Sequence, residues 1–128
     1  MKKVLLIDDD DIYNFLNKSL VEMSGLSKQV QICKSAFEGL SLLKGLSIEE
    51  LPDLILLDIM MPDMDGHGFL AEFVKLPETI SKRTKIAMLT SSLDPDDKEK
   101  SFKYEAVVDF IEKPLNQTKL NELKQKVD

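Results

Sequence analysis

Short apolar runs alternate with amphipathic stretches along this chain of 128 residues. Four runs of strand length are apolar throughout or nearly so, and a fifth alternates polar and apolar positions, so the pattern predicts five strands. They are Val4–Ile7, Gln29–Cys33, Leu54–Leu57, Lys85–Leu89 and Val107–Ile111. Continuous apolar runs are typical of strands that are buried on both faces, which favours a parallel sheet.

An amphipathic stretch with apolar residues at helical spacing follows each predicted strand. In the first, these residues are Ile12, Phe15, Leu16, Leu20 and Met23. The other four are Phe37–Leu46 behind Ser35 as N-cap, Phe69–Leu76 ended by Pro77, a short polar helix that begins at Asp94–Pro95, and Leu115–Val127. The residues from Met60 to Gly68 are rich in Pro, Asp and Gly and predict a loop.

Five strands that alternate with five helices predict an α/β fold, with a doubly wound parallel sheet and helices on both faces. The chain has one domain's length and ends near the last predicted helix, so we expect residues 1–128 to form a single domain without an output domain. In such sheets, ligands bind at the carboxyl ends of the strands.

Polar and charged residues follow four of the five predicted strands. Asp8 and Asp9 follow the first strand, Asp58 the third, Thr90 the fourth and Lys113 the fifth. Three carboxylates at one edge repel each other and favour a hard divalent cation, for which Mg²⁺ is the best match. A carboxylate nucleophile, a metal ion, a lysine and a hydroxyl are the groups that phosphoryl transfer needs.

Composition excludes several other classes of protein. The net charge of −6 and the pI near 4.8 argue against a nucleic-acid-binding domain. No run of eighteen apolar residues predicts a membrane span. A single cysteine, Cys33, excludes an internal disulfide and fits a cytoplasmic protein. We expect the only histidine, His67, to lie in an exposed loop rather than to act as a ligand or catalyst.

Four segments together resemble the receiver domains of response regulators in two-component signalling, and the resemblance runs from Lys3 to the final helix. The segments are Leu5–Asp9 (LLIDD), Leu54–Gly66 (LILLDIMMPDMDG), Met88–Ser91 (MLTS) and Phe110–Pro114 (FIEKP). The resemblance is to the stand-alone type of receiver and implies a flavodoxin-like sheet with the strand order 2-1-3-4-5.

The resemblance also implies the roles of the strand-end residues. Asp58 corresponds to the phosphoacceptor, Asp9 to a direct metal ligand, and Asp8 to a neighbour that acts mainly through water. Met60 corresponds to the position whose backbone carbonyl completes the Mg²⁺ site. Lys113 corresponds to the lysine that contacts the phosphoryl group.

Two further residues correspond to a switch in this family. Thr90 corresponds to a hydroxyl that moves towards the phosphoryl group, and Phe110 to an aromatic residue that turns inward when it does. The change is expected to repack the face formed by the helix at Asp94–Pro95, the strand Val107–Ile111 and the helix Leu115–Val127. The implied partners are a sensor histidine kinase or histidine phosphotransfer protein and an unidentified downstream protein. The implied state is a monomer or a weak phosphorylation-dependent dimer.

Three alternative functions remain to be weighed. A phosphatase with an aspartate nucleophile usually carries a second acid two residues later, where this chain has Met60. A binding module without phosphorylation would not need the intact set of charged strand-end residues. A flavin- or nucleotide-binding domain would be expected to carry a glycine-rich loop after the first strand, and none is present. The expectation is therefore a phosphoacceptor that assists its own phosphorylation and dephosphorylation, not an enzyme.

Overall fold

The computed structural model describes residues 2–91 and 94–127, and its centre is a five-stranded parallel sheet. The strand order is β2-β1-β3-β4-β5, and every neighbouring pair is parallel. The strands are β1 (Lys3–Ile7), β2 (Gln29–Cys33), β3 (Leu54–Asp58), β4 (Lys85–Thr90) and β5 (Val107–Glu112). The predicted doubly wound α/β fold and its strand order are confirmed.

Helices occupy the connections between the strands and cover the sheet. They are α1 (Asp11–Met23), α2 (Ala36–Gly45), the 3₁₀ helix η1 (Ile48–Glu50), α3 (Gly66–Phe73), α4 (Glu78–Ser81), α5 (Pro95–Phe102) and α6 (Gln117–Val127). The short helices η1 and α4 were not predicted, because three or four residues are too few to show a periodic pattern. Across the described ranges, no helix has the length and apolar character that a bilayer span requires.

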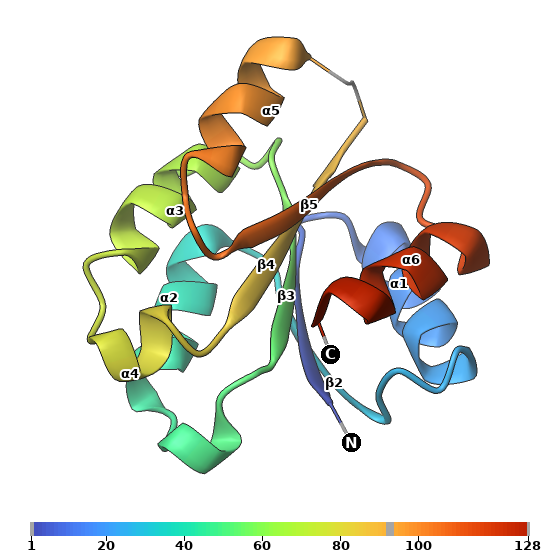
Figure 1. Ribbon diagram of the computed structural model, residues 1–128, viewed down its shortest axis with the longest axis horizontal. Helices are drawn as coiled ribbons and strands as arrows, with labels where there is room; N and C mark the ends of the chain where they lie inside the picture. The colour runs from blue at the N-terminus through green and yellow to red at the C-terminus, as the bar shows by residue number, and fades with distance from the viewer. Residues whose placement is uncertain (1, 92–93, 128) are drawn as a thin grey trace.

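The sheet separates two layers of helices (Figure 1). The helices α2, α3 and α5 lie on one side, and α1 and α6 lie on the other. The first layer contains the stacked rings of Phe69 and Phe73, whose centroids are 5.9 Å apart. In the second layer, Leu120 and Leu123 of α6 pack in one cluster with Leu6 of β1. The central strands are therefore buried on both faces, which explains their continuous apolar runs.

The helix α1 is rotated away from the orientation that its apolar stripe suggests. Phe15 is 69% exposed and Met23 is 83% exposed, and Ile12 and Leu16 are also exposed. The buried residues of α1 are Asn14, Asn17 and Val21. The short connection from β1, capped by Asp10, sets this rotation, and the Asn14 side chain donates a hydrogen bond to the carbonyl of Asp8 at 2.8 Å. Four of the five residues of the stripe therefore face outward, whereas Leu20 is half-buried and packs against the core on this side of the sheet.

The helix α3 begins earlier than the sequence suggested. Asp65 is its N-cap and accepts a hydrogen bond from the Gly68 amide at 2.9 Å. Residues 66–68, predicted as loop, form the first turn, because the Asp65 cap outweighs the low helix propensity of glycine. The prediction of an exposed loop position for His67 was wrong, since its side chain is half-buried on α3 and its Nε2 lies 3.0 Å from Asp97 Oδ1 on α5.

Candidate functional site

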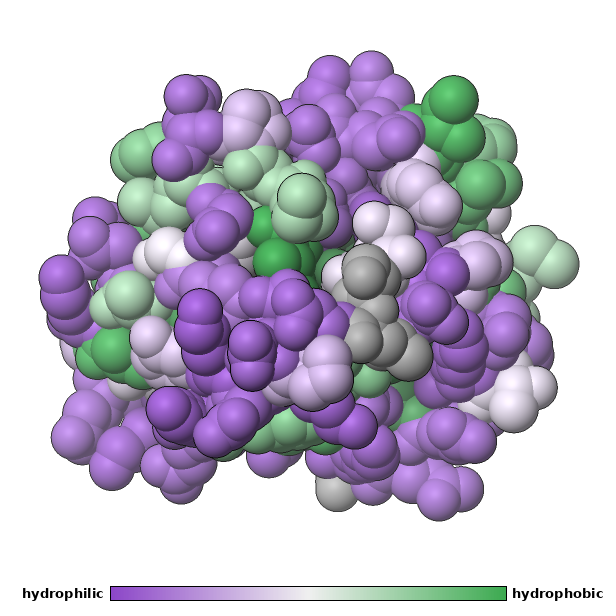
Figure 2. Space-filling view, turned by 90° about the horizontal axis from the view of Figure 1, so that it is seen from above, coloured by the Kyte–Doolittle hydropathy of each residue, from purple (hydrophilic) through white to green (hydrophobic). Residues whose placement is uncertain are grey.

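The polar strand-end residues meet at one edge of the sheet. Asp58 ends β3 and Thr90 ends β4, while Asp8 directly follows β1 and Lys113 directly follows β5. Asp58 is in register with Leu89, and the Thr90 carbonyl accepts a hydrogen bond from the Lys113 amide at 2.7 Å. Figure 2 views the molecule from this end and shows a largely hydrophilic surface.

Lys113 connects two carboxylates below this surface. Its ammonium nitrogen lies 2.9 Å from Asp8 Oδ2 and 3.2 Å from Asp58 Oδ1. All three side chains are buried, that of Lys113 being 7% exposed. Charged side chains are rarely buried unless they are paired. The burial of Lys113 between two carboxylates therefore indicates a specific ion-paired site, whereas most lysine side chains are exposed to solvent.

Asp9 completes a cluster of three carboxylates. Asp8, Asp9 and Asp58 each offer an oxygen atom, and these atoms lie within 4.8 Å of one another. Asp8 also accepts a hydrogen bond from the Asp10 amide at 2.9 Å, which fixes one of its oxygens. Asp9 is exposed and forms no hydrogen bond or ion pair with any residue in the two described ranges. One carboxylate thus faces solvent while two are buried beneath it.

This cluster shifts two pKa values. Burial and the neighbouring Asp8 carboxylate raise the pKa of Asp58 to about 6, although Lys113 and the Met60 amide act in the opposite direction. Burial alone would lower the pKa of Lys113, but its hydrogen bonds and ion pairs with Asp8 and Asp58 outweigh burial and raise it. The site therefore holds an excess of negative charge that only one lysine offsets.

The donor set fits a hard divalent cation. Three carboxylates and one lysine leave two negative charges, which match the charge of Mg²⁺. The Met60 amide donates a hydrogen bond to Asp58 Oδ1 at 3.3 Å, and this turn brings the Met60 backbone to the edge of the cluster. Met60 is 68% exposed, so only its backbone is suited to a role at the cluster.

Two residues of α1 support the site and were not predicted. The Lys113 nitrogen lies 4.2 Å from the centre of the Tyr13 ring, a cation–π contact. The Asn14 side chain binds the Asp8 carbonyl, as described above, and is buried. Both follow Asp8 closely in the sequence, but nothing in their spacing signals that α1 directs them towards the strand ends.

The two residues expected to form the switch are both buried. Thr90 is 2% exposed at the end of β4, and Phe110 is 8% exposed and packs in the core cluster that includes Phe69 and Met88. The ring of Phe110 therefore already points inward in this structure. Any conformational change at this position starts from a buried ring.

A glycine beside the end of β3 permits a close approach of the backbone. A Cβ atom on Gly66 would lie 2.9 Å from Ile59 Cα and 3.0 Å from the Asp58 carbonyl oxygen. Neither backbone atom can move without displacing Asp58. We therefore expect Gly66→Ala to lower the free energy of unfolding by about 2 kcal/mol, as overpacking does elsewhere. Urea denaturation measures the change.

The matched control for this variant is Gly45→Ala. A Cβ atom on Gly45, in the last turn of α2, would meet no atom within 4 Å. Alanine there is expected to be neutral or slightly stabilising, because it raises helix propensity. Equal stability of the two variants would show that the backbone around Asp58 relaxes without cost.

Comparisons with known proteins agree with this geometry. The sequence model of the response regulator receiver domain matches residues 4–125. The chain belongs to this family, the receivers of two-component signalling, which are normally non-catalytic phosphoacceptor modules. The acidic triad is typical of the Mg²⁺ site of these domains.

Similar proteins include both response regulators and a kinase. The probable C4-dicarboxylate response regulator DctR of Bacillus subtilis (strain 168) is 32% identical over 130 residues, which cover 98% of this chain and 50% of that protein. The histidine kinase CKI1 of Arabidopsis thaliana is 34% identical over 126 residues, which cover 91% of this chain and 11% of the kinase. The chain thus spans half or less of the length of these two relatives.

Solved structures share the whole fold. A two component response regulator from Cytophaga hutchinsonii is 34% identical with a TM-score of 0.90, and the match covers 98% of this chain and 95% of that one. The chemotaxis protein CheY4 of Vibrio cholerae is 26% identical with a TM-score of 0.82, over 100% of this chain and 99% of that one. The fold is therefore CheY-like.

Proposed function

We propose that these 128 residues act as one receiver domain, in which Asp58 accepts a phosphoryl group in a reaction that depends on Mg²⁺. The observation that supports this most directly is the position of Asp58, buried between Lys113 at 3.2 Å and two further carboxylates. The family supports it independently. Asp8, Asp9, Asp58 and the Met60 carbonyl would hold the metal ion.

The proposed reaction is a direct transfer. An oxygen of Asp58 forms a new bond to phosphorus, and the bond from phosphorus to the donor breaks, with its electron pair remaining on the donor's nitrogen or oxygen atom. The donor is a phosphorylated histidine of a kinase or phosphotransfer protein, or a small acyl phosphate. Lys113 would neutralise charge on the phosphoryl oxygens, and Tyr13 would hold its ammonium group near Asp58. When bound, Mg²⁺ would offset the repulsion between the carboxylates and the incoming group.

The exposed stripe of α1 supports a protein as the donor. The helix begins at Asp11, directly after the carboxylates of Asp8 and Asp9, and its outward face carries Ile12, Phe15 and Leu16. An exposed apolar patch of this kind is typical of an interaction site. A donor helix placed against α1 would bring its phosphorylated side chain over the strand ends.

We further propose that phosphorylation controls the face formed by α5, β5 and α6, through Thr90 and Phe110. Since the Phe110 ring is already buried, the phosphoryl group would stabilise this inward arrangement through the Thr90 hydroxyl rather than draw the ring in from solvent. Such a change is a shift between existing conformations, and it requires the phosphoryl group to favour one of them. The downstream protein would recognise the stabilised face.

Rapid phosphatase activity is a less favoured alternative. The position two residues after Asp58 is Met60. Its thioether can neither donate a proton to a leaving group nor accept a proton from water. The proposed acyl phosphate would therefore be hydrolysed slowly, with help only from the residues that also form it.

The test is the intact mass of the full chain after incubation with acetyl phosphate, with and without Mg²⁺. The wild type is expected to gain one phosphoryl group only when Mg²⁺ is present. Asp58→Asn should gain none, because the amide is a poor nucleophile and forms no acyl phosphate. Asp63→Asn is the matched control, since Asp63 lies in the loop after β3 and is exposed, and it should be phosphorylated normally.

No adduct in any condition, with the protein folded, would argue against the proposal. Beryllofluoride would then separate two explanations. Binding of beryllofluoride to the wild type but not to Asp58→Asn would indicate a site that accepts phosphate only from its own kinase. Absence of binding would indicate a binding module that works without phosphorylation.

A further inference from the structure

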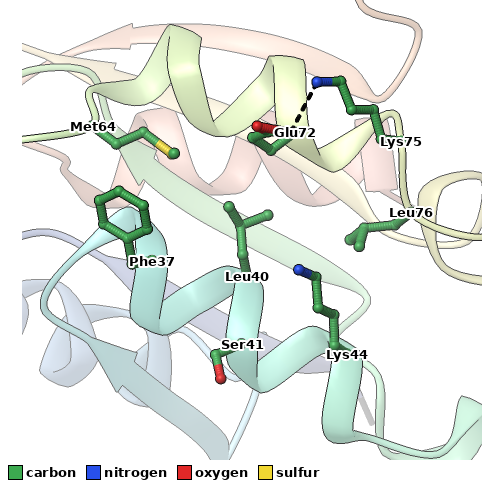
Figure 3. Close-up of a pocket in the computed structure, with 8 residues that line it drawn as sticks. All are labelled: Phe37, Leu40, Ser41, Lys44, Met64, Glu72, Lys75 and Leu76. Atoms are coloured by element: carbon green, nitrogen blue, oxygen red, sulfur yellow. Dashed lines mark ion pairs between the residues drawn. The ribbon is translucent and has the colours of Figure 1, made fainter.

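A groove between α2 and α3 (Figure 3) lies on the side of the sheet opposite α1 (Figure 1). Its volume is about 380 Å³, within the range of pockets that hold small ligands or the anchoring side chains of peptides. Its lining residues are Phe37, Leu40, Ser41, Lys44, Met64, Glu72, Lys75 and Leu76. None of them belongs to the carboxylate cluster or to the α5–β5–α6 face.

The floor and one end of the groove are apolar. Leu40 and Leu76 belong to the buried core and form its deeper part. Phe37 and Met64 face each other at one end, as Figure 3 shows, and Phe37 is 56% exposed. An aromatic ring left open beside a preformed apolar groove is suited to cover an apolar side chain of a partner.

The charge of the groove is opposite to that of the molecule. Lys75 pairs with Glu72 at 3.2 Å, which neutralises both side chains. Lys44 forms no hydrogen bond or ion pair within residues 2–91 and 94–127, and its amine points into the groove in Figure 3. The lining thus has one net positive charge in a chain with a net charge of −6. This charge complements a carboxylate.

We propose that the groove binds a short acidic and amphipathic segment of a partner protein, with an apolar side chain between Phe37 and Met64 and a carboxylate at Lys44. The apolar floor favours the apolar side chain of the partner, and the unpaired ammonium of Lys44 favours its carboxylate. A nucleic acid does not fit, because the surrounding chain is acidic and the groove offers a single free cation among its lining residues. The segment would bind independently of phosphorylation.

Lys44 also has an ordinary structural explanation that the test must separate. It lies in the last turn of α2, where a positive charge stabilises the helix dipole. That role would contribute to stability but not to recognition of an acidic ligand. Lys44→Gln and Lys44→Glu therefore need a binding measurement besides a stability measurement.

The experiment selects peptides from a random phage-displayed library on the full-length wild-type chain, after depletion of the library on the bare support. The expected peptides combine Leu or Phe with Asp or Glu. Their affinity for Lys44→Glu should fall about 10-fold or more, because attraction becomes repulsion. Phe37→Ser should also weaken them. Phe15→Ser, on the opposite side of the sheet, is the matched control and should bind them as the wild type does.

Three results would overturn the proposal. They are selection of basic peptides, selected peptides that bind Lys44→Glu as tightly as the wild type, and no enrichment over the bare support. Self-association that Phe37→Ser abolishes would assign the groove to a second copy of the chain and would also overturn it. An unchanged urea denaturation midpoint of Lys44→Glu would show that this variant is folded, and because it needs no phosphorylation it keeps this proposal separate from that for Asp58.

Discussion

Lys113→Met is expected to slow phosphorylation of Asp58 by acetyl phosphate about 100-fold or more at saturating Mg²⁺. Loss of one fixed charge that stabilises a developing anion typically has an effect of this size. Lys113 is the only cationic side chain that pairs with Asp58 among the described residues. Methionine keeps much of the side-chain volume, so the packing against Tyr13 is retained while the charge is lost. The rate is measured by intact mass over time.

Binding of Mg²⁺ separates this effect from a loss of structure. Lys113 competes with a cation for Asp8 and Asp58, so its removal should leave Mg²⁺ affinity unchanged or higher, as isothermal calorimetry can measure. A parallel loss of Mg²⁺ binding would contradict the proposed role and indicate a collapsed site. Lys103→Met, an exposed lysine at the end of α5, is the control and should match the wild type in both measurements.

Asp58→Asn is expected to raise the free energy of unfolding of the Mg²⁺-free protein by on the order of 2 kcal/mol at pH 7. The wild-type carboxylate is buried beside Asp8, and its pKa of about 6 shows that the folded protein disfavours its ionised form. Asparagine removes that charge but can still accept the hydrogen bonds from Lys113 and from the Met60 amide. Urea denaturation in the presence of a chelator measures the difference.

The pH dependence of this difference has a definite sign. The unfolded carboxyl has its ordinary pKa of 3.8, below the folded value of about 6. The wild type therefore gains stability from this group as the pH falls through 6, and the advantage of Asp58→Asn should disappear below about pH 4. Saturating Mg²⁺ should reduce or reverse the higher stability of Asp58→Asn at pH 7, because only the wild type has all three carboxylates to bind the ion. A constant difference across this pH range would contradict the raised pKa.

Much of the fold could be predicted because its signals are local. Buried parallel strands need continuous apolar runs, so Leu54–Leu57 was recognisable without any tertiary information. Helix caps are also local, and both Ser35 and Asp94 accept the backbone hydrogen bonds expected of them. The short helix η1 has a local signal of this kind, since Glu50 accepts a hydrogen bond from the Ser47 amide at 3.2 Å, but its three residues show no periodic pattern. The helix α4 begins after Pro77 without a side-chain cap.

The orientation of α1 shows where periodicity fails. Its apolar stripe predicted the helix correctly, but a stripe only faces the core when the connections to the sheet allow that rotation. Here the capped turn after β1 and the bond from Asn14 to the Asp8 carbonyl direct two asparagines inward. An outward apolar stripe is typical of an interaction site, and this departure coincides with a surface for which we propose a function.

The sequence by itself determined which residues reach the site. Asp8, Asp58, Thr90 and Lys113 all stand at the ends of recognisable strands, and parallel topology brings such ends to one edge. Only the tertiary structure decided the distances, the shared ion pairs of Lys113, its contact with Tyr13, the burial of Phe110 and the groove between α2 and α3. The reason is physical. Strand and helix formation depend on neighbours along the chain, whereas burial, pKa shifts and grooves depend on residues far apart in sequence that packing brings together.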